Sequence, residues 1–491
     1  MKLKELLNGI EYKLIQGNLQ EDITDICYDS RTYQKGEIFV CLVGIDTDGH
    51  QYIQQVIEKG CRCVMICNSI DIPLAPVTII EVQDTRKTLS FLSANFFHHP
   101  ADQLIKIAIT GTKGKTSTSF MIKSILEEEK EKVGLIGTIG TIIDQKLYPH
   151  KNTTPESYQI QKSMRLMVDC QTKYLIIETS SQALKVGRVN NILFDYGIFT
   201  NLSVDHIGSR EHSSYSDYVF SKSLLFKQCK VGILNHDDKE FKTMIAGSSA
   251  KVYCYGKKNS DLIIQKVHPV RQLEKLGTQL QTGGISHQNY YINCPGDFSA
   301  YNAAAAILLA KLLKIDEHTI KLGLKEFQVP GRCEIINIPN DIKVVIDFAH
   351  NKISMESIIK TMRQYHPNRI ITVFGCGGGR SLERRRELGE TSGALADFSI
   401  ITTDNSRNDL FCDIARDIQK GICEKKGEFI VIENRKEAIF YALDMAEKKD
   451  IILLLGKGHE RVQEIKGEKY YFNEKKIIQE YLEEKGRNVH E

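Results

Sequence analysis

The stretch Gly111-Thr112-Lys113-Gly114-Lys115-Thr116-Ser117 has the residue types of a loop that binds a nucleotide. A glycine-rich loop presents backbone N–H groups to an anion, and the N-terminus of a following helix adds its dipole. In such a loop Lys115 would reach the terminal phosphates of ATP, and the Thr116 hydroxyl would hold a magnesium ion. The usual pattern, G-x-x-x-x-G-K-S/T, has a further glycine where this chain has Ile109. A tight glycine turn before a helix is therefore the alternative.

Carboxylates and a histidine follow apolar, strand-like runs further along the chain. Glu178 follows such a run directly, and Asp205 and His206 come shortly after another one. Oxygen and imidazole ligands beside a triphosphate suit a divalent cation. We therefore predict a magnesium site here, although either residue alone is more typical of a structural role.

The residues around the glycine loop predict the elements that position it. Leu104 to Ile109 is an apolar run typical of a buried strand, and apolar residues between Met121 and Leu126 share one helical face. Further strand-like runs alternate with helical stretches, and these runs are 133–137, 174–177, 196–199 and 231–234. The alternation predicts a parallel sheet with helices on both faces, whose ligands bind beyond the carboxyl ends of the strands.

With 491 residues the chain is too long for one ordinary core, and its length suggests about three domains. Residues 1–100 mix short strands and helices, and Asp29-Ser30-Arg31 there is more typical of a capped turn than of a ligand site. Val329-Pro330-Gly331-Arg332 predicts a boundary. Strand-like runs follow it at 344–348, 370–374, 399–402, 429–432 and 451–455. We predict an α/β protein with domains 1–100, 101–330 and 331–491, the central one a P-loop sheet and the last a doubly wound, Rossmann-like sheet.

Composition and charge narrow the class of protein. Lys plus Arg total 65 and Asp plus Glu total 62, so the net charge of +3 gives no electrostatic reason to expect nucleic acid or a membrane surface as partner. The 13 cysteines include no C-x-x-C pair and are expected to be reduced core residues of a cytosolic protein. The first residues, to Leu14, suggest a short amphipathic helix without the apolar core of a signal peptide, and no apolar run approaches transmembrane length. We expect a cytoplasmic monomer.

Several motifs in order resemble those of the Mur ligases of peptidoglycan synthesis. They are GTKGKTS, NTTPES, ETSSQALKVGRV, FTNLSVDH, YVFSKSLLF, VPGR, DFAH, DNSR and GKGHERVQ, and the resemblance runs from Ser30 to Gln463. Their order and spacing are most similar to the branch that adds the third residue of the peptide. The resemblance implies an N-terminal domain that grips UDP, a central ATPase and a C-terminal domain for the incoming amino acid. It also implies that ATP phosphorylates a carboxylate of the peptide precursor, after which an amine attacks the acyl phosphate.

The resemblance carries site residues over by matched position. ATP would be bound by Gly111, Thr112, Lys113, Gly114, Lys115, Thr116, Ser117, Asn302, Arg332, Asp347 and His350. The UDP-sugar peptide would be bound by Ser30, Asn152, Thr153, Thr154, Ser180, Arg188 and Lys222. Magnesium would be held by Thr116, Glu178, His206 and Lys222, and the catalytic set would be Lys115, Glu178, His206 and Lys222.

Lys222 matches a position that family members carboxylate with carbon dioxide. A carbamate converts this cation into an anionic metal ligand, which a site with a triphosphate and magnesium can use. Its formation requires the neutral amine, which burial favours. The alternative is a solvated lysine on a helix.

The amino acid that is added is implied by the C-terminal motifs. The residues concerned are Arg380, Asp404, Asn405, Ser406, Arg407, Gly456 and Glu460. The guanidinium of Arg407 could bind the distal carboxylate of meso-diaminopimelate, and Glu460 could accept its ammonium. The alternative for Arg407 is an exposed arginine beside a helix start capped by Asn408 or Asp409. We favour meso-diaminopimelate over L-lysine, with another diamino diacid such as lanthionine also open.

The chain departs from the family pattern at several positions. Gln182 and Val186 replace a usual His and Gln, and Ser406 replaces a usual Pro. The loop after His206 resembles that of some lysine-adding members and is two residues longer than the common form. Two other readings stay open: a folylpolyglutamate synthetase, against which DNSR and GKGHE argue, and a nucleotide-binding scaffold that has lost catalysis. The run Gly-Cys-Gly-Gly-Gly from Gly375 lacks the spaced fingerprint of a dinucleotide fold.

Overall fold

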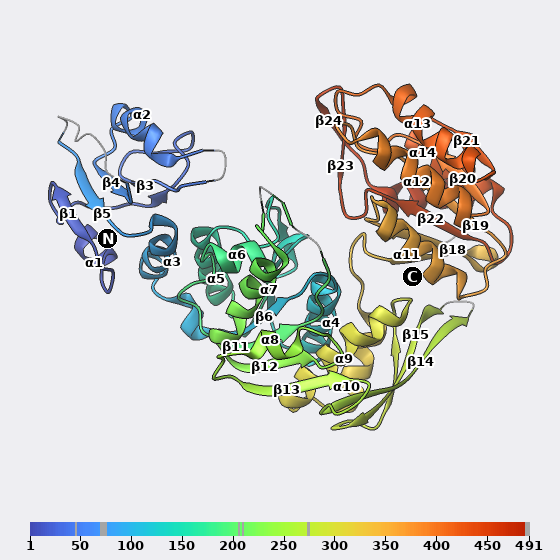
Figure 1. Ribbon diagram of the computed structural model, residues 1–491, viewed down its shortest axis with the longest axis horizontal. Helices are drawn as coiled ribbons and strands as arrows, with labels where there is room; N and C mark the ends of the chain where they lie inside the picture. The colour runs from blue at the N-terminus through green and yellow to red at the C-terminus, as the bar shows by residue number, and fades with distance from the viewer. Residues whose placement is uncertain (45–46, 69–75, 205–206, 209–210, 273–274, 487–491) are drawn as a thin grey trace. The chain divides into compact units, whose positions relative to one another are not determined.

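The computed structural model describes residues 1–491 except 45–46, 69–75, 205–206, 209–210, 273–274 and 487–491 (Figure 1). The chain forms two compact units. The first contains residues 1–263 and 304–323, and the second contains residues 264–303 and 324–491. Among the described residues, no helix is long and apolar enough to cross a membrane.

The N-terminal part of the first unit is a five-stranded sheet in the order β1-β5-β4-β3-β2. Its strands are β1 (Lys13–Gln16), β2 (Ile26–Cys27), β3 (Ile38–Val40), β4 (Cys63–Ile66) and β5 (Thr78–Glu81), all parallel to their neighbours except β1. One face packs against α1 (Leu3–Leu6) and α3 (Thr85–Phe96), and the other packs against α2 (Ile53–Glu58). The predicted N-terminal helix therefore ends at Leu6, and the segment beyond it pairs as β1.

A larger sheet in the first unit has the order β13-β12-β11-β6-β10-β7-β8-β9. Its strands are β6 (Ile105–Thr110), β7 (Val133–Gly137), β8 (Gly140–Ile143), β9 (Lys146–Tyr148), β10 (Tyr174–Glu178), β11 (Phe194–Phe199), β12 (Cys229–Asn235) and β13 (Lys251–Gly256). The strands from β13 to β7 are parallel, and β8 and β9 are antiparallel additions. The helices are α4 (Lys115–Glu128), α5 (Ser157–Asp169), α6 (Ser181–Lys185), α7 (Tyr215–Ser223), α8 (Phe241–Ile245), α9 (Asp297–Leu312) and α10 (Glu317–Glu326). Strand β14 (Leu262–Gln272) joins β13 through its first two residues.

The second unit contains a six-stranded sheet in the order β17-β18-β22-β19-β20-β21. Its strands are β17 (Glu334–Ile338), β18 (Ile342–Asp347), β19 (Ile370–Phe374), β20 (Phe398–Ile401), β21 (Phe429–Val431) and β22 (Ile451–Leu455), and only β17 is antiparallel to its neighbour. Strands β15 (Lys275–Gly284) and β16 (Asn289–Ile292) pair in this unit, and β23 (Val462–Ile465) and β24 (Glu468–Tyr471) form a hairpin.

Helices cover both faces of the six-stranded sheet. They are α11 (Lys352–Arg363), α12 (Leu382–Leu395), α13 (Phe411–Glu424), α14 (Arg435–Met445) and α15 (Glu474–Glu484). The apolar cluster on one face includes residues of α14 and α15 and none of α11, α12 or α13, which contact β19, β20 and β21 separately. Asparagine side chains cap α11, α14 and α15 at their N-termini, which fixes where each helix begins after its loop. The predicted doubly wound sheet is confirmed.

The sequence-based α/β assignment is confirmed, and each predicted strand lies within a few residues of an observed one. The predicted parallel central sheet is confirmed for the strands from β13 to β7, and the antiparallel strands β8 and β9 are additions that the sequence did not predict. All 13 cysteines are free, but Cys412 and Cys423 are exposed, so the prediction that they are core residues is wrong for these two.

Candidate active site

The glycine loop joins β6 to α4, as the sequence predicts. Gly114 is the N-cap of α4 with φ of 85°, and no side chain caps the helix. Gly111 has φ of 152°, and a Cβ there would collide with Oγ1 of Thr200. Because the first N–H groups of a helix lack partners within the helix, this uncapped start is suited to bind an anion.

Lys115 lies at the first position of α4. Its Nζ donates to the carbonyl oxygens of Gly111, at 2.8 Å, and Thr112, at 3.2 Å. These acceptors belong to the loop itself, so the ammonium is held over the place where phosphate oxygens would lie. The residues present therefore fit a bound polyphosphate.

Glu178 ends β10 and is completely buried. Its Oε2 accepts hydrogen bonds from the hydroxyls of Thr116 and Thr138, both at 2.9 Å, and its Oε1 accepts from the Thr138 N–H at 3.2 Å. Burial raises the pKa of this carboxyl, while Lys115 and the Thr138 and Thr116 hydrogen bonds act in the opposite direction. The carboxyl is thus removed from solvent, and its nearest partners are hydroxyl groups.

The Thr116 hydroxyl and the Glu178 carboxylate offer the oxygen ligands that magnesium prefers. The predicted ligand His206, with its neighbour Asp205, lies outside the described residues. Among the residues that are described, no group of three or more His, Cys, Asp or Glu side chains is arranged to hold a metal ion. Thr116 and Glu178 fit magnesium as two members of a larger ligand set.

Lys222 lies on α7 and is only 2% exposed, so the alternative of a solvated lysine is wrong. Its Nζ donates to the Gly111 carbonyl oxygen at 2.9 Å and lies 4.7 Å from the centre of the Tyr218 ring. The Tyr218 hydroxyl in turn lies 3.0 Å from Oγ1 of Thr112. Lys222 and Lys115 therefore contact the same carbonyl group of the glycine loop.

Most residues predicted to bind the UDP-sugar peptide lie near Glu178. Oγ1 of Thr154 donates to the Glu178 carbonyl oxygen at 2.7 Å and accepts from the Ser180 N–H at 3.0 Å. Arg188 donates to the Thr154 carbonyl oxygen at 3.0 Å and to Glu156 at 2.9 Å. Oγ1 of Thr153 lies 3.1 Å from that of Thr138.

Two further predicted residues lie in a turn and a loop. Ser30 lies in the turn after β2, where its carbonyl oxygen accepts from Lys59 at 2.6 Å. Asn152 is exposed in the loop before α5.

Three residues predicted to approach the nucleotide gather in the second unit, at the end of β18. Asp347 is half-buried, and its carboxylate accepts from the N–H groups of Cys333, at 2.7 Å, and Ala349, at 2.8 Å. Burial raises the pKa of Asp347, and the charge of Arg332 opposes this shift. Nδ1 of His350 lies 2.7 Å from the Phe348 carbonyl oxygen, and burial lowers the pKa of this histidine.

The Arg332 guanidinium stacks 4.8 Å from the centre of the Phe348 ring, which places it beside Asp347 and His350. Asn302, the fourth predicted residue, is buried on α9.

The residues predicted to hold the amino acid lie at the carboxyl ends of β20 and β22. Nδ2 of Asn405 donates to Oε2 of Glu460 at 2.8 Å. Arg407 has a left-handed backbone with φ of 52°, and its side chain donates to the Gly378 carbonyl oxygen at 3.3 Å and lies 3.6 Å from Glu464. Helix α13 begins after Leu410 without a side-chain cap, so the predicted capping by Asn408 or Asp409 is wrong.

The other residues of this set are near the same loop. Asp404 is buried, and a Cβ on Gly456 would lie 2.5 Å from its Oδ2. Ser406 is buried and Arg380 is exposed.

Three family models match the chain. They are Mur ligase family, catalytic domain (residues 22–97), Mur ligase middle domain (109–310) and Mur ligase, glutamate ligase domain (331–458). The chain is 38% identical to the UDP-N-acetylmuramoyl-L-alanyl-D-glutamate--2,6-diaminopimelate ligase of Clostridium perfringens, with 99% of this chain and 100% of that protein covered. It is 39% identical to the protein of that name from Caldanaerobacter subterraneus subsp. tengcongensis, with 99% of each chain covered. The chain belongs to the Mur ligase family.

This chain also matches a solved structure of a UDP-N-acetylmuramoyl-L-alanyl-D-glutamate--2,6-diaminopimelate ligase, with a TM-score of 0.71. The identity is 25%, and the match covers 99% of this chain and 100% of that one. The resemblance read from the motifs is therefore confirmed at the level of the family and its three-domain fold.

The structure adds residues to this Mur ligase site that the sequence motifs did not single out. Thr138 follows β7 and makes two hydrogen bonds to Glu178, and Tyr218 lies between Thr112 and Lys222. Lys457 is fully buried between Asn405 and Glu460. The sequence Gly456-Lys457-Gly458 could have indicated Lys457 as a site residue, since a lysine between two glycines at the end of a strand is expected near a ligand.

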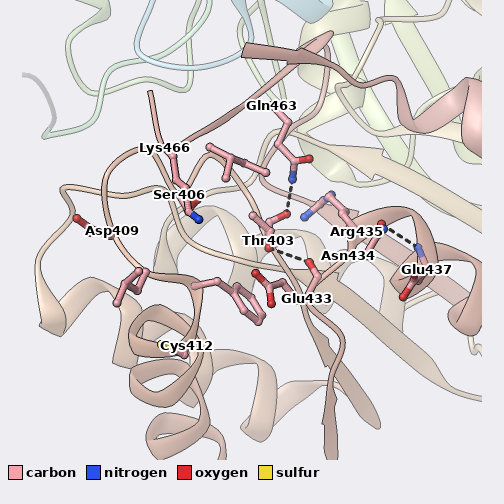
Figure 2. Close-up of a pocket in the computed structure, with 13 residues that line it drawn as sticks. Thr403, Ser406, Asp409, Cys412, Glu433, Asn434, Arg435, Glu437, Gln463 and Lys466 are labelled. Atoms are coloured by element: carbon pink, nitrogen blue, oxygen red, sulfur yellow. Dashed lines mark hydrogen bonds between the residues drawn. The ribbon is translucent and has the colours of Figure 1, made fainter. Parts of the chain in front are cut away.

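A cavity of about 600 Å³ lies beside the Asp404–Arg407 loop of this Mur ligase (Figure 2). Its lining includes Thr403 and Ser406 from that loop, the first residues of α13 and α14, and residues of β23. Arg435 at its edge is fully buried and forms an ion pair of 2.7 Å with the buried Glu474. The charged side chains of the lining include both acids and bases, so the cavity does not select a ligand of one charge.

Proposed function

We propose that this Mur ligase joins meso-diaminopimelate to UDP-MurNAc-L-Ala-D-Glu in an ATP-dependent reaction of peptidoglycan synthesis. The observation that carries the proposal is the 38–39% identity over essentially the whole chain to relatives named for this reaction. The buried Glu178 and Lys222 beside the glycine loop support catalysis and argue against a scaffold that has lost it. We further assign residues 1–100 to the UDP moiety, 101–330 to ATP and 331–491 to the amino acid, in line with the three family matches.

The reaction consists of two transfers at one carboxylate of the D-glutamate residue. A carboxylate oxygen attacks the γ-phosphorus of ATP, ADP leaves, and an acyl phosphate forms. The amine of the incoming amino acid then attacks the acyl carbon, inorganic phosphate leaves, and the nitrogen loses a proton to give the amide. A carboxylate is a poor electrophile and therefore needs this activation. Because the acyl phosphate is a reactive mixed anhydride, it must be kept from water until the amine attacks.

Residues of the first unit suit the phosphoryl transfer. The N–H groups at the start of α4 and the Lys115 ammonium bind and orient the phosphates. Thr116 and Glu178, with His206, would hold magnesium, which neutralises the charge that develops on the transferred phosphoryl group. Thr138 keeps the Glu178 carboxylate in one orientation through its hydroxyl and its N–H.

We also propose that Lys222 carries a carbamate derived from carbon dioxide. Its burial and its position 2.9 Å from the Gly111 carbonyl oxygen place the terminal nitrogen beside the phosphate-binding loop. A carbamate there would replace a cation by an anion near the metal, which suits a further magnesium ligand.

The proposed setting of the enzyme follows from its family and composition. We expect a monomer in the cytoplasm that acts on small molecules, without nucleic-acid or membrane partners. Its product would serve cell wall biogenesis and hence cell shape and cell division.

A phosphate-release assay with UDP-MurNAc-L-Ala-D-Glu, ATP and a panel of amino acids tests the proposal. Release that depends on both the UDP-dipeptide and meso-diaminopimelate is expected. Release with folate and glutamate alone, or with no combination, would exclude the proposed activity.

L-lysine is the second candidate for the added amino acid. The observation in its favour is that Glu464 lies 3.6 Å from Nε of Arg407 and offsets part of the charge that would bind a second carboxylate. Comparing kcat/KM for the two amino acids distinguishes them, and we expect the larger value for meso-diaminopimelate.

A further inference from the structure

Lys457, in the loop after β22, has no exposed side-chain surface. An ammonium group has three N–H donors. Nζ of Lys457 has three acceptors: Oδ1 of Asn405 at 2.9 Å, the Val462 carbonyl oxygen at 2.9 Å and Oε2 of Glu460 at 3.2 Å. The Phe472 ring, 6.0 Å away, contributes a further contact. Each donor is therefore used, and two of the acceptors belong to the proposed amino-acid site.

The contact with Lys457 fixes the orientation of the Asn405 side-chain amide. Oδ1 of Asn405 accepts from Lys457 and from the Glu464 N–H at 3.0 Å. Rotation of the amide by half a turn would place its NH₂ group against these two donors, which is unfavourable. The NH₂ group of Asn405 is consequently directed at Glu460, to which it donates at 2.8 Å.

The same ammonium also fixes the Glu460 carboxylate. Oε2 of Glu460 accepts from both Lys457 and Asn405, whereas Oε1 takes part in neither bond. The Glu460 side chain is 33% exposed, so its carboxylate lies at the surface of the unit above a buried cation. This arrangement leaves the other carboxylate oxygen, Oε1, available to a ligand.

If Lys457 had a purely structural role, its ammonium would be expected to pair with the buried carboxylate of Glu474. That carboxylate is instead bound by the Arg435 guanidinium, through Nε at 2.8 Å and Nη2 at 2.7 Å. The three N–H groups of Lys457 are instead all directed at the loops that carry Asn405, Glu460 and Val462. The geometry thus connects Lys457 to the site more closely than to the core beneath it.

We propose that Lys457 is a positioning residue that sets the Glu460 carboxylate, directly and through the Asn405 amide, to accept an ammonium group of the incoming diamino acid. This inference rests on the proposed function, since it concerns the amino-acid site of that reaction. Lys457 acts through Asn405 and Glu460 and need not touch the substrate.

The test compares Lys457→Met, Glu460→Gln and the double variant with the wild type. Lys469→Met, on the exposed strand β24, is the matched control. We expect Lys457→Met to raise KM for the amino acid about 30-fold while KM for ATP and for the UDP-dipeptide stays within about twofold. Because Lys457 acts through Glu460, the double variant should be no worse than Glu460→Gln alone. Independent, additive effects of the two changes, or an unchanged KM in Lys457→Met, would overturn the inference.

Two controls separate the role of Lys457 from misfolding of the variant and from an error in the proposed substrate. If Lys457→Met does not fold, Lys457→Gln retains a side-chain donor, and the same cycle with Glu460→Gln is measured in that background. The wild type is first assayed against the amino-acid panel. If it uses an amino acid other than meso-diaminopimelate, the proposed substrate is wrong, but the cycle is run with the amino acid that it does use and still decides the role of Lys457.

Discussion

Around the glycine loop, two of the groups proposed to do chemistry are themselves buried: Glu178 is completely enclosed and Lys222 is 2% exposed. Around the Asp404–Arg407 loop the buried groups are supports such as Lys457, while the Arg407 side chain is 46% exposed. Backbone groups form much of the first site, since Lys115 and Lys222 both bind the Gly111 carbonyl oxygen. The second site is formed mainly by side chains from separate loops.

This difference suggests that the two sites tolerate change differently. A buried site built on backbone groups performs a step that does not depend on the amino acid, and changes there should abolish the reaction. A site of partly exposed side chains on a buried support can exchange individual contacts, and changes there should alter which amino acid is used. The following predictions test this contrast.

The largest effect is expected at Lys115. Lys115→Ala removes the ammonium that lies over the phosphate-binding loop, so kcat for phosphate release should fall about a thousandfold with every amino acid tested. Lys146→Ala, on the exposed strand β9, is the control and should retain wild-type activity. A loss confined to one amino acid would break the contrast between the two sites.

A smaller loss is expected for Lys222→Ala, between about a hundredfold and a thousandfold in kcat. If the lysine carries a carbamate, a small carboxylate such as acetate should partly restore the rate of this variant. Lys227→Ala removes an exposed lysine just beyond the same helix and should have no such effect. Full activity of Lys222→Ala would show that the carbamate is not needed.

Arg407→Ala should change selectivity more than turnover. The wild type is expected to prefer meso-diaminopimelate over L-lysine by about a hundredfold in kcat/KM, because lysine leaves the guanidinium without a carboxylate partner. The variant should lose most of this preference, whereas Arg416→Ala, an exposed arginine on α13, should keep it. Equal use of both amino acids by the wild type would contradict the role given to Arg407.

The smallest effect concerns the stability of the ligand-free protein. Burial raises the pKa of Glu178 above that of the unfolded chain, so ionising it costs the folded state free energy. Its contribution to stability is therefore lost as pH rises from about 4, the unfolded value, through the raised folded value. Glu178→Gln should remove this penalty and make the inactive, ligand-free protein more stable than the wild type at pH 7.

Denaturant unfolding at pH 5 and pH 8 measures this effect. Glu129→Gln, an exposed acid at the end of α4, is the control for general changes in charge. A ligand-free Glu178→Gln variant that is less stable than the wild type at pH 8 would show that the hydrogen bonds from Thr116 and Thr138 outweigh the cost of burial.

The sequence predicted the strand, loop and helix around Lys115 well because their features are local. An apolar strand, a glycine loop and a helix are consecutive, so the position of Lys115 at the start of α4 follows from the pattern. The partners of Glu178 are less accessible to such reasoning. Thr138 meets Glu178 only because β7 lies beside β10, and strand order is not contained in hydrophobic periodicity.

The amino-acid site shows a further limit of the sequence patterns. A lysine between two glycines suggests an exposed loop, yet Lys457 is buried, because loops from two strand ends and the β23 segment close over it. Strands β14 to β16 were also missed, since polar residues interrupt their alternation. The role of His206 stays a prediction, because that residue lies outside the described part of the chain.

The buried ion pair between Arg435 and Glu474 has a consequence for protein engineering. The two residues begin α14 and α15, and each is almost without exposed surface. A hybrid enzyme whose crossover falls between these positions inherits the two charges from different parents. If the second parent lacks either charge, the remaining one is enclosed without its partner, which typically costs about 3–5 kcal/mol. If the crossover is placed before α14 or after Glu474, both residues of the pair come from the same parent, and such hybrids are expected to fold.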